Sequence, residues 1–173
     1  MISEARAALA EAGFHLLEPE HPIRDLSIAK EVIQEFSKLD LDLLLVFQAT
    51  FADSTMVVEI AQAIDAPLFL WAVPEPWSGG RLRLNSLCGI NLSGHALHRA
   101  SLEYDYLYTF PEDPAAIQKV QVLANAGHAL RTLQNTRIGR FGQHPHGFDS
   151  CIPNPDGLLQ KLGVKIVQVE LQD

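Results

Sequence analysis

Residues 41–47 read LDLLLVF, and this stretch decides the fold that we expect for the chain. A nearly continuous run of large apolar side chains is typical of a strand that helices cover on both faces. We therefore predict a central strand from Leu41 to Phe47. Similar runs predict further strands from Pro67 to Val73 and from Tyr104 to Thr109.

Segments with helical character separate these strands. Ile28, Val32, Ile33 and Phe36 share one face of a helix expected over residues 27–39. Further helices are expected over residues 3–12, 54–64, 91–101 and 113–135. The alternation of helix and strand predicts an α/β fold, a doubly wound parallel-sheet (Rossmann-like) domain. Such a domain usually begins with a buried strand, and this chain begins with a helix, so we expect the first strand to be lacking.

The pattern changes after Asn135. Residues 137–141 have strand character and are followed by the turn-rich stretch GQHPHGFDSCIPNPDG, a short helix near Leu158 and a last strand over residues 165–171. We therefore predict a Rossmann-like N-terminal domain over residues 1–135. Residues 136–173 would be the beginning of a second α/β domain or a C-terminal extension packing on the first.

Composition excludes several classes of function. The 173 residues carry a formal net charge of −8 and no cluster of Lys and Arg, which argues against nucleic acid and against anionic membranes as partners. The apolar runs are too short to span a bilayer. The two cysteines, Cys88 and Cys151, are far apart and form no CxxC pattern, so we expect a soluble protein of the reducing cytoplasm.

Candidate ligand-binding residues follow the predicted strands, because open α/β sheets bind ligands at the carboxyl ends of their strands. After the first predicted strand, Gln48 or Thr50 can bind a hydroxyl group, although Asp53 and Ser54 in the same loop are also good helix N-caps. The stretch WAVPEPWSGGRLRLNSLCGIN, starting at Trp71, carries two Trp, one Glu and two Arg. Aromatic faces beside polar groups suit a sugar. The structural alternative puts Trp71 in the core and Trp77 in a subunit contact.

A metal site is the weaker interpretation of the late histidines. His144, His146 and Cys151 carry ligand types that suit zinc, but their loop has no carboxylate partner in a fixed helical spacing. A structural or substrate-lining loop is therefore favoured. An unrelated small α/β enzyme that uses this loop as a metal site stays open as an alternative.

Three segments resemble the L-fucose/L-arabinose isomerase family of sugar isomerases: QATFADS at 48–54, the stretch from Leu70 to Asn91, and RIGRFGQHPHGFDSC at 137–151. Their order and spacing are similar to those in the N-terminal portion of that family. The resemblance implies two α/β domains followed by a C-terminal domain, and interconversion of aldoses and ketoses with a divalent ion, commonly manganese. It also implies a homo-oligomer in which N-terminal loops of one subunit cover the site of the next.

The resemblance further implies roles for particular residues. Trp71 or Trp77 resembles the aromatic side chain given to a neighbouring subunit, and His146 occupies the place of a substrate-contacting side chain. The family's catalytic carboxylates and metal ligands lie in later polypeptide, so we expect no catalytic residue and no metal ligand in this chain. The expected function is that of a substrate-lining and oligomerising N-terminal region of a ketol isomerase for a deoxy or pentose sugar, inactive alone. The alternative is a stand-alone sugar-binding or regulatory domain.

Overall fold

A computed structural model describes residues 1–75, 77 and 79–171 and shows two compact units, residues 1–127 and 128–173. The division falls inside the longest helix. The first unit is an α/β fold with a parallel sheet, as the apolar strand pattern predicts. Among the described residues, no helix has the length and apolar character needed to cross a membrane.

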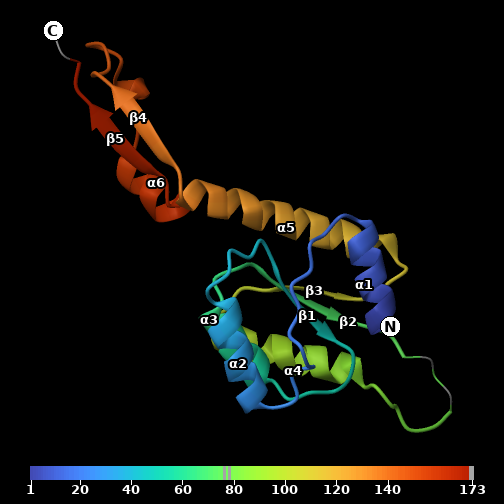
Figure 1. Cartoon of the computed structure of the whole chain (residues 1–173). Helices are drawn as coiled ribbons and strands as arrows, with labels where there is room; N and C mark the ends of the chain where they lie inside the picture. The colour runs from blue at the N-terminus through green and yellow to red at the C-terminus, as the bar shows by residue number, and fades with distance from the viewer. Residues whose placement is uncertain (76, 78, 172–173) are drawn as a thin grey trace. The chain divides into compact units, whose positions relative to one another are not determined.

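The sheet of the first unit has three parallel strands in the order β1-β2-β3 (Figure 1). They are β1 (Leu44–Gln48), β2 (Leu68–Ala72) and β3 (Asp105–Tyr108). Leu44 pairs with Leu68, and Phe69 pairs with Asp105. The carboxyl ends of all three strands therefore meet at one edge of the sheet. The helices of this unit are α1 (Ile2–Glu11), α2 (Leu26–Phe36), α3 (Thr55–Ala63), α4 (Ser86–Arg99) and the first part of α5 (Pro114–Gln134).

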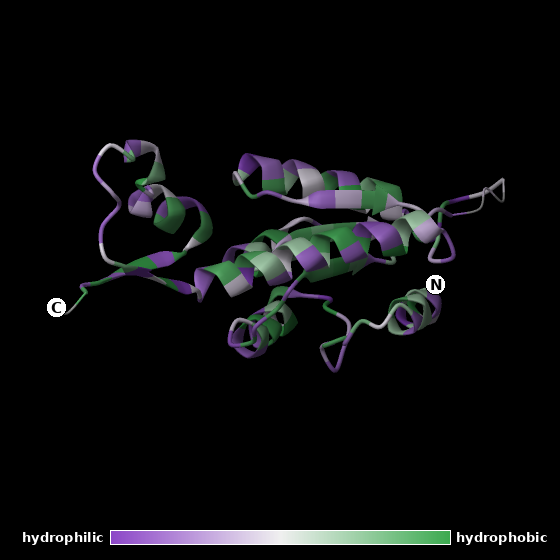
Figure 2. Cartoon of the chain, turned by 90° about the horizontal axis from the view of Figure 1, so that it is seen from above, coloured by the Kyte–Doolittle hydropathy of each residue, from purple (hydrophilic) through white to green (hydrophobic). Residues whose placement is uncertain are grey.

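Helices cover both faces of this sheet. Successive side chains of β2 point to opposite faces, and both sets pack against helices. Leu68, Leu70 and Ala72 pack in one hydrophobic cluster with residues of α2, α3 and α4. Phe69 and Trp71 pack in the other cluster with residues of α1 and α5. The parts of this sheet that are visible between the helices in Figure 2 are largely green, the colour of hydrophobic residues. This is the doubly wound arrangement that the alternating sequence predicts.

The prediction that residues 41–47 form the central strand is wrong for the described part of the chain. The central strand is β2, in which all five residues are buried, whereas β1 lies at the edge and three of its five residues are half-buried. Helices cover β1 on both faces, so its sequence is as apolar as that of a central strand. Apolar character therefore reports the two covering layers and not the number of neighbouring strands.

Local signals place several helix ends. Asp25 caps α2, because its carboxylate accepts hydrogen bonds from the N–H groups of Ser27 and Ile28 at 2.9 and 3.0 Å. Gly13 follows α1 with φ of 85°, a conformation that favours glycine. Helix α4 begins at Ser86, five residues before the predicted start at Asn91. Gly89 and Gly94 lower the helix propensity of this segment. Tertiary contacts explain why glycine occupies these two positions.

Those contacts are close approaches of other groups to α4. A Cβ atom at Gly89 would overlap the side-chain amide of Gln48, and one at Gly94 would lie 2.6 Å from the hydroxyl oxygen of Tyr104. Packing therefore requires glycine at helical positions where intrinsic propensity disfavours it.

The second unit contains the end of α5 and a two-stranded parallel sheet. Its elements are β4 (Arg137–Phe141), the 3-10 helix η1 (Asp149–Cys151), α6 (Pro155–Leu162) and β5 (Lys165–Val169). Arg137 pairs with Lys165 and Phe141 with Val169. Gly163 ends α6 with φ of 71°. Among the described residues of this unit, Val164 is the one buried hydrophobic side chain.

Candidate functional site

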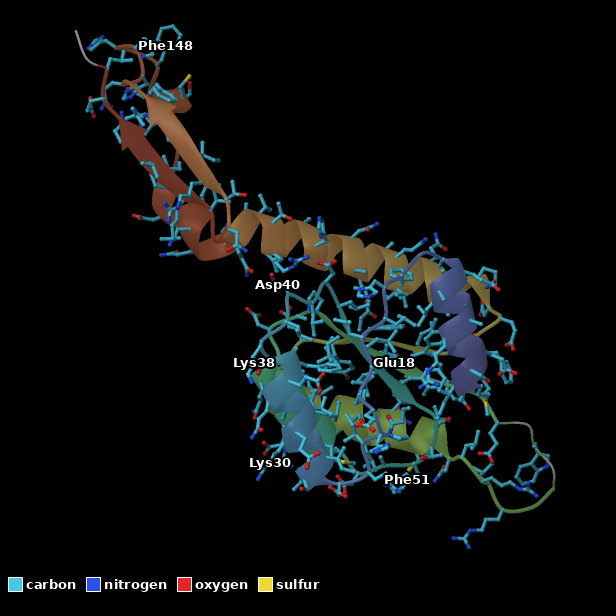
Figure 3. All side chains as sticks on the ribbon, viewed as in Figure 1. Glu18, Lys30, Lys38, Asp40, Phe51 and Phe148 are labelled. Atoms are coloured by element: carbon cyan, nitrogen blue, oxygen red, sulfur yellow. The ribbon has the colours of Figure 1, made fainter. Side chains whose placement is uncertain are left out.

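The candidate site is the carboxyl edge of the first sheet, where the loops after β1, β2 and β3 begin. Parallel strands deliver these loops to the same edge, which is where open α/β sheets bind ligands. The loop after β1 is tied directly to the loop after β2, because the backbone N–H of Phe51 donates to the carbonyl oxygen of Leu84 at 2.6 Å. Phe51 itself is exposed and is labelled in Figure 3.

Gln48 is the last residue of β1, and only 6% of it is exposed. Its side-chain oxygen accepts a hydrogen bond from the Ser93 hydroxyl at 3.4 Å, and its amide group lies against Gly89. The side chain therefore points under α4. In this arrangement Gln48 joins β1 to α4 through a buried polar contact.

Trp71 and Trp77 have opposite surroundings. Trp71 is fully buried within β2, stacks edge-on with Phe47 at a ring-centroid distance of 5.3 Å, and donates its indole N–H to the carbonyl oxygen of Thr109 at 3.1 Å. Trp77 is 77% exposed on the loop that joins β2 to α4. The structure thus places Trp71 in the core, the structural alternative raised from the sequence. It leaves Trp77 as the tryptophan with a face open to a ligand or to another subunit.

Glu75 organises the same loop. Its carboxylate accepts hydrogen bonds from three consecutive backbone N–H groups, those of Arg83, Leu84 and Asn85; the last two measure 2.9 Å each. The bond from Asn85 is the main cause that lowers the pKa of Glu75, and those from Leu84 and Arg83 and the charge of Arg83 act in the same direction against partial burial. The carboxylate is therefore ionised at neutral pH.

The other two helix starts at this edge are also occupied by carboxylates of the chain. Asp53 accepts a hydrogen bond from the N–H of Thr55 at 2.8 Å, at the start of α3. Asp113 accepts from the Thr109 hydroxyl at 2.6 Å, the main cause that lowers its pKa, and from the N–H of Ala115 at 2.9 Å. Helix N-termini that are free bind anions. Here each terminus already has a carboxylate that accepts one of its N–H groups, and the negative charge of that carboxylate disfavours a phosphate.

His146 lies in the second unit, exposed in the turn after β4. Its neighbour His144 is partly buried; the His144 Nε2 atom lies 3.8 Å from an oxygen of Asp149, and Cys151 is exposed. Among the described residues, no three His, Cys, Asp or Glu side chains are grouped so that they could hold a metal ion. The donor set present in this part of the chain therefore does not fit a manganese or zinc centre.

The role of Glu75 was not predicted, although the sequence shows one Glu beside Arg81 and Arg83 in this stretch. The partners of Glu75 lie eight to ten residues further along the chain and carry no local signature. The charge of Arg83 also lowers the pKa of Glu75. The short separation in sequence between Glu75 and the first turn of α4 is a signal that could have indicated the contact.

A parallel sheet covered by helices on both faces, with polar loops at its carboxyl edge, places the first unit in the class of doubly wound α/β domains. Residues 3–134 match the N-terminal domain of the fucose/sulfoquinovose isomerases, so the chain belongs to this family of sugar isomerases. The resemblance noted in the sequence is thereby confirmed, for fucose isomerase-like proteins.

Three curated relatives show how much of such a protein the chain represents. The sulfoquinovose isomerase of Priestia aryabhattai is 28% identical over 158 residues, which cover 91% of this chain and 35% of that protein. Those of Alkalicoccus urumqiensis and Clostridium sp. (strain MSTE9) are 32% and 30% identical and cover 75% and 76% of the chain. The chain therefore spans about a third of the length of these relatives.

Proposed function

We propose that this chain lines the sugar site and contributes to the subunit contacts of an aldose–ketose isomerase, and that it has no turnover by itself. The observation that carries the proposal is the family match over residues 3–134, combined with an exposed Trp77 at the ligand-binding edge of the sheet. An aromatic face that stands out of a domain can stack on the C–H face of a sugar.

The chemistry explains why this chain would supply orientation and not turnover. Aldose–ketose interconversion removes a proton next to a carbonyl, and the resulting enediolate charge needs acid–base groups and electrostatic stabilisation. We propose that those groups, and a divalent ion such as manganese, belong to polypeptide that corresponds to the remaining length of the relatives. Orientation of the sugar by Trp77 is the part that we assign to this chain.

For the substrate we propose a sulfonated hexose in place of the deoxy or pentose sugar expected from the sequence. The relatives are named sulfoquinovose isomerases, and a sulfonate is an anion that guanidinium groups bind well. Arg81 and Arg83 put two guanidinium groups on the loop that carries Trp77. The helix N-termini of the same edge are taken up by Asp53 and Asp113, which leaves the arginines as the group suited to a negative charge.

A domain exchange tests this function. Residues 3–134 would replace the matching segment of the Priestia aryabhattai sulfoquinovose isomerase, and isomerisation would be assayed with sulfoquinovose, fucose and arabinose. We expect an active chimera in which Trp77→Ala lowers kcat/KM by about tenfold or more and Trp77→Phe retains most of it, since stacking needs an aromatic face. Tyr106→Ala, at another exposed aromatic residue, on β3, is the control and should have little effect.

Two results would contradict the proposal. One is sugar interconversion by the purified 173-residue chain with or without added manganese. The other is an active chimera that is indifferent to Trp77→Ala. Saturable sugar binding by the chain alone together with a folded but inactive chimera would favour the stand-alone sugar-binding domain.

A further inference from the structure

The two ends of the loop between β2 and α4 are held together by the side chain of Glu75. We call the contact between the Glu75 carboxylate and the backbone N–H groups of residues 83–85 the Glu75 anchor. Three N–H groups in a row form a concave, electropositive surface of the kind that binds anions. Because Glu75 fills this surface, Glu75 and Arg83 lie beside each other although they are eight residues apart in the sequence.

Asn85 gives the anchor its geometry. This residue lies in the left-handed region, with φ of 51° and ψ of 35°, immediately before the first residue of α4. The left-handed region is unfavourable for most side chains but is tolerated by asparagine. A conformation of this kind persists where surrounding contacts hold it, and here the 2.9 Å hydrogen bond from the Asn85 N–H to Glu75 does so.

Two further contacts connect the anchor to the sheet. The hydroxyl of Ser86 donates to the carbonyl oxygen of Val73, just after β2, and both residues are buried. The N–H of Phe51 donates to the carbonyl oxygen of Leu84, which ties the anchor to the loop after β1. The base of the loop is thus fixed to two neighbouring strands, while Trp77 and Leu82 stay exposed.

We propose that Glu75 is a positioning residue for sugar binding: its carboxylate fixes the base of the loop that carries Trp77 at the carboxyl edge of the sheet. The role rests on the proposed function, because it assigns to Trp77 the contact with the sugar. A loop held before the ligand arrives loses less conformational entropy on binding. Loss of the anchor should therefore weaken binding through Trp77 without removing any group that contacts the sugar.

The first test follows amide hydrogen exchange in the 173-residue chain. In Glu75→Ala and Glu75→Gln we expect the protection of the amides of residues 83–85 to fall at least tenfold, while the amides of β2 keep theirs. Glu75→Asp retains the charge on a shorter side chain and should restore part of the protection. Glu59→Gln, at an exposed glutamate of α3, is the matched control. Unchanged protection in all Glu75 variants would overturn the proposal.

Acidification of the unmodified chain gives the same readout without a substitution. The pKa of Glu75 is below its usual 4.5, so the anchor is intact above pH 4.5 and should be lost as the pH falls through the lowered value. Protection factors of residues 83–85, corrected for intrinsic exchange, should fall over that range in the unmodified chain and stay low throughout in Glu75→Gln. A pH profile of this kind would not arise if Glu75 only filled space.

The second test separates the anchor from the function of Trp77. In the active chimera, Glu75→Ala should raise KM several-fold with a smaller change in kcat, and it should have no further effect when combined with Trp77→Ala. Additive effects would overturn the positioning role even where exchange confirms the anchor. If Trp77→Ala has no effect in the chimera while exchange shows the anchor, the proposed function fails and the structural contact stands.

Discussion

The two compact units use the same kind of structure with different degrees of burial. In the first unit, β2 is parallel to both neighbours and all of its residues are buried. In the second unit, β4 and β5 are also parallel, yet four of the five residues of β4 are exposed and Phe141 is 72% exposed. Parallel sheets are almost always covered on both faces. The difference teaches that local sequence specifies strands and crossovers, whereas burial depends on covering layers. Among the described residues, the first unit alone covers both faces of its own sheet.

The largest expected effect is the difference in stability loss between two truncations, of Trp71 in the first unit and of Phe141 in the second. Trp71→Ala leaves a large cavity in the core and loses the hydrogen bond to Thr109, so it should destabilise the first unit by about 3–5 kcal/mol. Phe141→Ala removes a mostly exposed ring and should change stability by less than about 0.5 kcal/mol. Urea unfolding followed by residue-resolved NMR reports each unit separately. Equal losses would mean that Phe141 is covered in solution.

A second comparison uses one glycine from each unit. A Cβ atom at Gly127 would overlap the backbone carbonyl of Asp42, which cannot move away as a flexible side chain can. Gly127→Ala should therefore cost about 1–3 kcal/mol despite the better helix propensity of alanine. At Gly139 a Cβ would stand 3.6 Å from the Phe141 ring, an ordinary contact, so Gly139→Ala should be close to neutral. Thermal unfolding of the two variants checks the contrast.

A third comparison concerns helical glycines whose neighbours differ in mobility. At Gly94, an added Cβ would lie 2.6 Å from the hydroxyl of Tyr104, a half-buried ring, so Gly94→Ala should cost about 1 kcal/mol. Tyr104→Phe in the same chain should recover part of this loss, because the obstructing oxygen is gone. At Gly157 the neighbour is the side chain of Asn154, which can rotate, and alanine should cost less there. The side-chain oxygen of Asn154 caps α6 by accepting a hydrogen bond from the Gly157 N–H at 2.9 Å. A larger loss at Gly157 would show that this cap matters more than packing.

The smallest expected effect is a pH dependence confined to the first unit. The pKa of Asp113 is lowered, first by the hydrogen bond from Thr109 and then by that from Ala115, so this carboxylate stabilises the fold above its usual value of 3.8. The contribution is lost as the pH falls through the lowered pKa. Asp113→Asn should flatten the acid limb of the stability profile of the first unit. The same substitution should leave the β4–β5 amides unaffected in hydrogen exchange.

Sequence reasoning located what depends on short-range pattern. The apolar runs predicted β1, β2 and β3, each within a few residues of its observed bounds. The order of strands in the sheet could not be predicted. An apolar run indicates that helices cover both faces of a strand, but it does not indicate how many strands pair with it. This is why residues 41–47 were expected at the centre and lie at the edge.

The candidate site was predictable at the level of loops and not of side-chain orientation. The rule that ligands bind beyond the carboxyl ends of strands selected the loop of Trp77 from the sequence. Whether Trp71 is exposed or buried depends on how far the helices cover the carboxyl end of β2, which sequence alone does not fix. The Glu75 anchor depends on a backbone turn at Asn85, and Asp53 and Asp113 likewise act on main-chain groups. A hydrogen bond to a backbone N–H does not depend on the side chain of its donor residue, so the sequence gives little indication of it.

The position of β1 also has a consequence for how the chain behaves in solution. Within the part of the chain that the structure describes, β1 pairs on one side only, so a row of its main-chain donors and acceptors stands beside half-buried apolar side chains. Such a row is a template on which an extended segment of another molecule can add as a further strand. In concentrated solution, molecules of the chain should therefore self-associate through the unpaired edge of β1 before either unit unfolds.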